Sequence, residues 1–174
     1  GKKTNQFQLG SEYFSADNIV SNAVASTIYL VDEYDTLNET GVFILSGNPV
    51  LTISGIDQAR GAIFTRDGNR IVTYSPQEIR VSSFSTGQEL IKISTPAERV
   101  ILSNDDSLLA AAAPDGSVAL FNLTDGSPKI ELTGNGSAVT LLKFLQSGAH
   151  LAIGSEESTS VWDTTSGKKV YELA

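Results

Sequence analysis

The sequence predicts an all-β protein that consists of four consecutive four-stranded units. A short phrase, an apolar strand end followed by a polar turn, occurs four times; Phe14, Phe64, Leu102 and Phe144 mark it at intervals of 50, 38 and 42 residues. Gly, Asp, Asn and Ser separate short runs rich in β-branched and aromatic residues, which is typical of strands joined by tight turns. No long run of helical periodicity interrupts this pattern.

Each phrase contains the first strand of a unit, and three further apolar runs follow it. A glycine-containing turn precedes the fourth run, and the turn glycines Gly87, Gly126 and Gly167 lie 39 and 41 residues apart. We therefore expect each unit to be one four-stranded antiparallel sheet. The expected second, third and fourth strands are 19–25, 28–31 and 42–45; 71–74, 79–81 and 89–93; 108–113, 118–121 and 129–132; and 151–153, 160–162 and 170–173.

Repetition of a four-stranded unit about every 40 residues is the sequence pattern of β-propeller blades. The expected blades are 5–53, 54–94, 95–133 and 134–174, so that a partial propeller occupies residues 1–174. The blades would pack face to face and bury aliphatic side chains. The side chains expected in these interfaces are Ile71, Leu108, Leu109, Val118, Leu151 and Ile153.

Composition limits the classes of function. The chain has 174 residues, a formal net charge of −8 and no cysteine. An acidic chain with scattered Lys and Arg lacks the basic face that nucleic acids and anionic lipids require, so neither is an expected partner. The absence of cysteine excludes disulfides and thiolate metal sites, and no apolar run is long enough to span a bilayer. We expect no metal and no other cofactor.

No arrangement of residues in the sequence predicts catalysis. His150 is the only histidine. It falls in an expected turn without a paired nucleophile, so a solvated side chain is the simpler interpretation. Asp105 and Asp106 are adjacent in another turn, where neighbouring side chains point apart and serve the turn itself. The acidic run 32–39 lacks the alternation and the glycine of a calcium loop, so we interpret it as a solvated loop.

The third and fourth units carry the motifs of a known family. The fourth contains Trp162-Asp163 at the end of its third expected strand, and the third has a tight Asp115-Gly116 turn followed by Phe121-Asn122. In this order and spacing the two units resemble WD repeats, whose name-giving dipeptide corresponds to Trp162-Asp163. The second unit has Ser82-Ser83 at that place, and the Gly-His pair that often precedes the first strand is missing. The resemblance assigns structural roles to Asp115, Gly116, Phe121, Trp162 and Asp163.

The resemblance also implies a function. WD-repeat rings usually hold seven or eight blades and act as non-catalytic scaffolds for protein or peptide partners. The four expected blades would then be completed by further blades from the same or another chain, in an intracellular setting. In this family the connections that lead into the first strands, and the turns between the second and third strands, form the most used binding face. The corresponding residues are Gln58, Arg60, Gln77, Glu98, Arg99, Asp115, Asn135, Ser137 and Glu156.

Two other classes of function remain open. A propeller-type enzyme, such as a hydrolase or lactonase, would need inward-facing His, Glu or Asp from several blades, and the chain has a single histidine. A ligand-binding or lipid-headgroup-binding propeller would need basic pairs on a blade edge, and neither an Arg-Arg nor a Lys-Arg pair occurs. An activity screen would test the first class, and a liposome pull-down would test the second.

Overall fold

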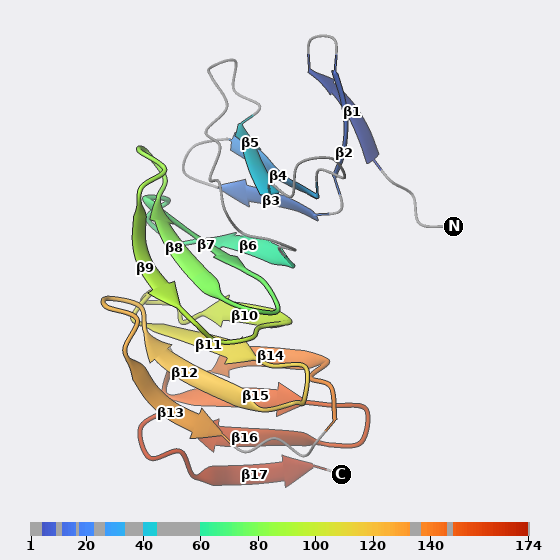
Figure 1. The fold of residues 1–174 in the computed structure, drawn as a ribbon. Helices are drawn as coiled ribbons and strands as arrows, with labels where there is room; N and C mark the ends of the chain where they lie inside the picture. Colours follow the sequence, from blue (N-terminus) through green and yellow to red (C-terminus); the bar gives the residue numbers. More distant parts are fainter. Residues whose placement is uncertain are drawn as a thin grey trace.

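The computed structural model describes residues 60–132, 137–145 and 148–173 in full and, before them, five strands by their backbone. These parts of the chain contain seventeen β-strands and no α-helix, which confirms the predicted all-β class (Figure 1). A helix long and apolar enough to cross a membrane is therefore not found among the described residues.

Three four-stranded antiparallel sheets follow one another along the chain, each in simple sequential strand order. The first contains β6 (Gly61–Phe64), β7 (Arg70–Tyr74), β8 (Ile79–Ser83) and β9 (Glu89–Ile93). The middle sheet contains β10 (Arg99–Leu102), β11 (Leu108–Ala112), β12 (Val118–Asn122) and β13 (Pro128–Leu132). The last sheet contains β14 (Leu141–Leu145), β15 (His150–Gly154), β16 (Thr159–Asp163) and β17 (Lys169–Leu173).

The turns between the first and second strands use one hydrogen-bond pattern in two of these sheets. The hydroxyls of Thr65 and Ser103 each donate to an aspartate two residues later, Asp67 or Asp105, at 2.6 Å. Each aspartate also accepts the backbone N–H of the residue two positions further on. These bonds, with that of the hydroxyl first, lower the pKa of both carboxyls from 3.8 to about 2. The repeated polar phrase of the sequence is thus a repeated turn.

The turns between the third and fourth strands need glycine. Gly87, Gly126 and Gly167 have φ angles of 70°, 74° and 67°, in the left-handed region that other residues avoid. The residue that precedes each of these turns accepts the glycine N–H, at 2.8 to 2.9 Å, through its backbone carbonyl. The even spacing of these glycines in the sequence therefore reflects one turn geometry that occurs once in each sheet.

The three sheets are stacked, and a hydrophobic core lies between each consecutive pair (Figure 1). Strand β11 of the middle sheet is buried on both faces, since Leu109 and Ala111 belong to one core and Ala110 and Ala112 to the other. The first core also contains Val72, Ile79, Val81, Ile93, Ala97, Val100, Phe121 and Leu123. The second core also contains Val118, Leu120, Leu132, Leu142 and Leu151.

The N-terminal strands differ from the prediction of a four-stranded unit at 5–53. Strands β1 (Asn5–Leu9) and β2 (Glu12–Ala16) form a two-stranded sheet, and a separate three-stranded sheet contains β3 (Asn18–Asn22), β4 (Thr27–Glu33) and β5 (Thr40–Ile44). One residue separates β2 from β3, whereas five separate β6 from β7. Because a hairpin commonly needs a loop of at least two residues, β2 does not fold back on β3. It pairs with β1 instead.

Candidate functional site

Two cavities lie at opposite ends of the interface regions between the stacked sheets. Antiparallel pairing brings the connections that lead into β6, β10 and β14 to the same end as the β7–β8, β11–β12 and β15–β16 turns. We call the hollow at this end, of about 400 Å³, the connection cavity; its lining is Glu98, Arg99, Ala112, Ala113, Pro114, Ala138 and Val139. The hollow at the other end, of about 600 Å³, is the turn cavity; its lining is Ile63, Phe64, Arg66, Ile101, Leu102, Ser103, Asn104 and Asp106.

The connection cavity has charged groups on one side and small apolar groups on the other. Glu98 and Arg99 come from the β9–β10 connection and the start of β10, and both side chains are exposed. The backbone N–H of Glu98 donates to the carbonyl of Ala112 at 2.8 Å, which holds this connection against the end of β11. The opposite wall belongs to the segment before β14, through Ala138 and Val139. The cavity can therefore receive an apolar group whose neighbour is polar.

An ion pair extends the charged side of the connection cavity toward the first four-stranded sheet. Nε of Arg60 lies 3.3 Å from a carboxylate oxygen of Glu98. Half-buried Tyr74 is close to this group: burial raises the pKa of its hydroxyl, Arg99 lowers it, and Glu98 raises it. Arg60 of the second expected unit thus lies close to Glu98 and Arg99 of the third, as predicted for residues that share a face.

The β11–β12 turn borders the same cavity. The carboxylate of Asp115 accepts the backbone N–H of Ser117 at 3.0 Å and its hydroxyl at 2.6 Å, and the hydroxyl bond in particular lowers the pKa of Asp115. Gly116 has a φ of 85°, and a Cβ atom there would overlap the backbone carbonyl oxygen of Ser137. The structure therefore brings Asp115 and Gly116 next to Ser137, which the sequence places in a different unit.

The remaining residues of the predicted binding face lie farther along the same end or outside the described part. Gln77 is in the β7–β8 turn, where its N–H donates to the hydroxyl of Ser75 at 3.2 Å. The carbonyl of Ser75 accepts the N–H of Ala97, so this turn is attached to the β9–β10 connection. Glu156 is exposed in the β15–β16 turn. Gln58 and Asn135 lie outside the described residues.

The residues that the resemblance assigns to structure lie within or between the sheets. Phe121 is buried in the core between the first and middle sheets. Trp162 is half-buried against the core between the middle and last sheets, and its indole N–H donates to the hydroxyl of Ser160 at 2.8 Å. Asp163 accepts the N–H of Ser166 at 2.7 Å, the first of the bonds that lower its pKa and stabilise the β16–β17 turn.

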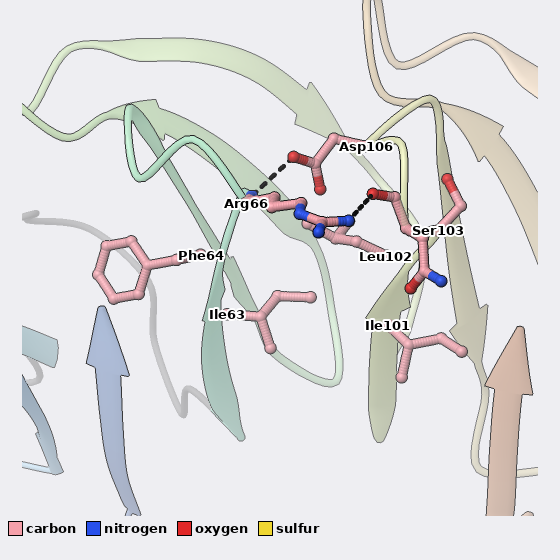
Figure 2. Close-up of a pocket in the computed structure, with 8 residues that line it drawn as sticks. Ile63, Phe64, Arg66, Ile101, Leu102, Ser103 and Asp106 are labelled. Carbon is pink, nitrogen blue, oxygen red and sulfur yellow. Dashed lines mark hydrogen bonds between the residues drawn. The ribbon is translucent and has the colours of Figure 1, made fainter. Parts of the chain in front are cut away.

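The turn cavity was not anticipated from the sequence (Figure 2). Asp106 accepts the backbone N–H of Arg66 at 2.6 Å, and the guanidinium of Arg66 donates to the carbonyl of Asn104 at 3.3 Å. These bonds join the β6–β7 turn to the β10–β11 turn across two sheets. Asp106 also has a φ of 54°, where glycine stands at the same place in the other two four-stranded sheets, Gly68 and Gly148. Asp tolerates this region better than most residues do.

The two adjacent aspartates of this turn have different partners. Asp105 serves its own turn, whereas Asp106 binds the neighbouring turn, so their carboxylates do not form an acid–base pair. The turn cavity has apolar walls, and one cationic and one anionic residue, Arg66 and Asp106, also line it. A signal for it existed in the sequence, since Asp106 occupies the glycine position of a repeated turn. Its partner is 40 residues away, and nothing in the sequence indicated that.

His150 differs from its prediction as a solvated turn residue. It is the first residue of β15, directly opposite Asp163 on β16, and it is half-buried. Its Nδ1 atom is buried and has no hydrogen-bond partner among the described residues. Pairing of β15 with both β14 and β16 extends to this residue, which explains why the turn is shorter than expected.

In the described part of the chain, no group of three or more His, Cys, Asp or Glu side chains could hold a metal ion. Comparisons with known proteins add no family to this geometry: no protein-family model matches the sequence, and no curated protein matches it either.

Proposed function

We propose that this chain is a β-propeller portion of the WD-repeat type and binds a protein or peptide, without catalysing a reaction, at the connection cavity. The observation that supports this most directly is that residues from separate repeats come together at one cavity. Residues predicted from separate repeats to share one binding face line this cavity or border it: Arg60, Glu98, Arg99, Asp115 and Ser137.

Three features of the stacked sheets support the propeller arrangement in this proposal. The sheets have the same strand order, each has its first strand nearest the first strand of the neighbouring sheet, and each pair encloses a core. Connections at one end of such a stack are held on rigid strands, which suits recognition.

The lining of the connection cavity specifies the kind of partner. Ala112, Ala113 and Pro114, with Val139 opposite, would enclose a small or medium apolar side chain. The exposed guanidinium of Arg99 would bind a carboxylate beside it in two-pronged geometry. We therefore expect a peptide segment in which an apolar residue is next to Asp, Glu or a terminal carboxylate.

A displayed random-peptide library selected on the whole chain tests this function. The selected peptides should share an apolar residue beside an acidic one. They should bind at least about tenfold more weakly to the Arg60→Glu/Arg99→Glu double variant, since loss of about 1.4 kcal/mol gives that factor. Ala138→Trp, which fills the cavity from an exposed position on its rim, should have the same effect.

Lys129→Glu provides the matched control, because Lys129 is exposed near the start of β13, at the opposite end of the middle sheet. It should leave peptide binding unchanged. Selected peptides that bind all three variants as tightly as they bind the original chain would refute the proposed site, and so would a selection that enriches no peptide.

A further inference from the structure

The turn cavity contains two opposite charges that are not paired with each other. Arg66 follows β6 and Asp106 precedes β11, and both side chains line the cavity (Figure 2). Among the described residues, neither side chain forms an ion pair. One carboxylate oxygen of Asp106 accepts the backbone N–H of Arg66, and one guanidinium nitrogen of Arg66 donates to the carbonyl of Asn104. The other carboxylate oxygen and the other guanidinium nitrogens can therefore bind a ligand.

Much of the remaining lining is apolar. Ile63 and Ile101 line the cavity from β6 and β10, the first strands of two neighbouring sheets, and Leu102 lies beside Ile101. All three side chains are half-buried, so they can lose further solvent contact when a ligand binds. The volume of about 600 Å³ is within the range of ~300–1,000 Å³ that is usual for small-molecule sites.

The stack of sheets contains a second, equivalent place without these charges. Between the middle and last sheets, Asn104 stands where Arg66 stands, and Gly148 stands where Asp106 stands. A Cβ atom on Gly148 would lie 3.3 Å from Cβ of Ser103, so these two turns also approach each other closely. Stacking therefore explains why neighbouring turns meet, but it does not explain the charges, which occur at only one of the two described places.

The backbone at Asp106 also indicates a specific requirement. Its φ of 54° lies in the left-handed region, where Gly68 and Gly148 occupy the equivalent positions of the other two sheets. A side chain in this region has a backbone cost that glycine does not have, and such costs are often found at binding sites. The carboxylate at this position thus has a use that glycine could not serve.

The two charges restrict the chemistry of a ligand. A simple anion attracted to Arg66 would be repelled by Asp106, and a simple cation attracted to Asp106 would be repelled by Arg66. A small molecule with both charges avoids this conflict. A free α-amino acid has its carboxylate and its ammonium group on one carbon atom, whereas an unbranched peptide has these groups at its two separate ends.

We propose that the turn cavity binds a free α-amino acid with a large apolar side chain. The guanidinium of Arg66 donates to the ligand carboxylate, and Asp106 accepts from its ammonium group. The ligand side chain packs against Ile63 and Ile101. This site lies at the opposite end of the interface region from the connection cavity, so either proposal can fail without the other.

Equilibrium dialysis of the whole chain with radiolabelled phenylalanine or leucine tests this site. We expect a dissociation constant between about 10 µM and 1 mM for ligands of this size. Phenylalaninamide lacks the carboxylate, N-acetylphenylalanine lacks the ammonium group, and glycine lacks the apolar side chain. Each should compete at least about tenfold more weakly than phenylalanine, since each loses one of the three contacts.

Two variants remove one charge each. Arg66→Gln and Asp106→Asn should each weaken binding by at least about tenfold. Arg66 is exposed, and asparagine keeps an acceptor and tolerates the φ of Asp106, so both variants should fold. Arg99→Gln is the matched control, because it removes an exposed arginine that lines the connection cavity instead, and it should leave the dissociation constant unchanged.

Three results would overturn the proposal. The first is that neither phenylalanine nor leucine binds at concentrations up to about 10 mM, well above the expected dissociation constants. The second is that phenylalaninamide or N-acetylphenylalanine competes as well as phenylalanine, since one of the two charges would then be dispensable. The third is that Arg66→Gln, with an unchanged urea midpoint, binds as tightly as the original chain, while Arg99→Gln binds more weakly; the ligand would then occupy the connection cavity.

Discussion

Leu132 and Leu173 occupy equivalent positions in consecutive sheets, so truncating each to alanine measures what a covering sheet contributes. Leu132 is 1% exposed in the core between the middle and last sheets. Leu132→Ala should lower the free energy of unfolding by about 2–5 kcal/mol, because it removes buried methyl groups and creates a cavity. Leu173 is 69% exposed, so about a third of its full burial energy of ~1.5–3 kcal/mol is at stake, and Leu173→Ala should cost roughly 0.5–1 kcal/mol.

Urea unfolding followed by tryptophan fluorescence is the assay. Trp162 is the only tryptophan and packs against the core that contains Leu132, so its emission reports on that interface. With a denaturant slope of about 1–3 kcal/mol per molar, Leu132→Ala should lower the midpoint by about 1 M or more, and Leu173→Ala by a small fraction of that. Equal losses for the two variants would refute the claim that Leu173 is exposed while Leu132, at the equivalent position of the middle sheet, is buried.

Three further predictions concern the turns. In urea unfolding, Gly126→Ala should destabilise the fold by about 2–4 kcal/mol and Gly167→Ala by about 1–2 kcal/mol. Both alanines incur the cost of the left-handed backbone, but only the Cβ atom added at position 126 would overlap a neighbour, Ile91. A larger loss for Gly167→Ala would contradict this ranking. The depressed pKa of Asp105, about 2, means that its turn is stabilised above the unfolded pKa of 3.8 and loses this contribution as pH falls toward 2. Urea midpoints of the original chain should therefore fall between about pH 5 and pH 3 more steeply than those of Asp105→Asn, and parallel pH profiles would show that the turn bond contributes nothing. Asp106→Ala should lower the free energy of unfolding by about 2 kcal/mol in the same assay, because it removes the bond to Arg66 at a strained φ. Asp106→Asn, which keeps an acceptor and tolerates that φ, should lower it much less. Equal losses for the two variants would show that the bond to Arg66 does not stabilise this turn.

The strands of the three four-stranded sheets could be predicted because each lies between turns with a strong local signal. Gly87, Gly126 and Gly167 adopt a backbone conformation that favours glycine, so their spacing in the sequence gives the period of the fold. The predicted fourth strands 89–93, 129–132 and 170–173 agree with β9, β13 and β17 to within one residue. Local turn chemistry is readable from sequence because the residues that make it are neighbours.

Pairing and contacts between distant residues could not be predicted in the same way. The strands expected near the N-terminus exist, but β2 pairs with β1, and this depends on a connection of one residue that the apolar pattern does not reveal. The bond between Asp106 and Arg66 joins turns of two sheets, so it follows from stacking and not from either turn alone. For the connection cavity, the sequence indicated Glu98 and Arg99, but not the apolar wall of Ala138 and Val139 opposite them.

Stacking also explains why recognition is expected at the ends of the strands. Both faces of the middle sheet are buried: Ala111 packs toward the first sheet and Ala110 toward the last. A strand covered on both faces offers no side chain to a partner, so binding residues must come from the segments between strands. Arg99 lies at the boundary, on the first residue of β10, and its side chain is exposed. A change at Arg99 can therefore alter recognition while the cores remain intact, whereas a change at Ala110 or Ala111 alters the stack itself, and this difference makes the binding variants interpretable.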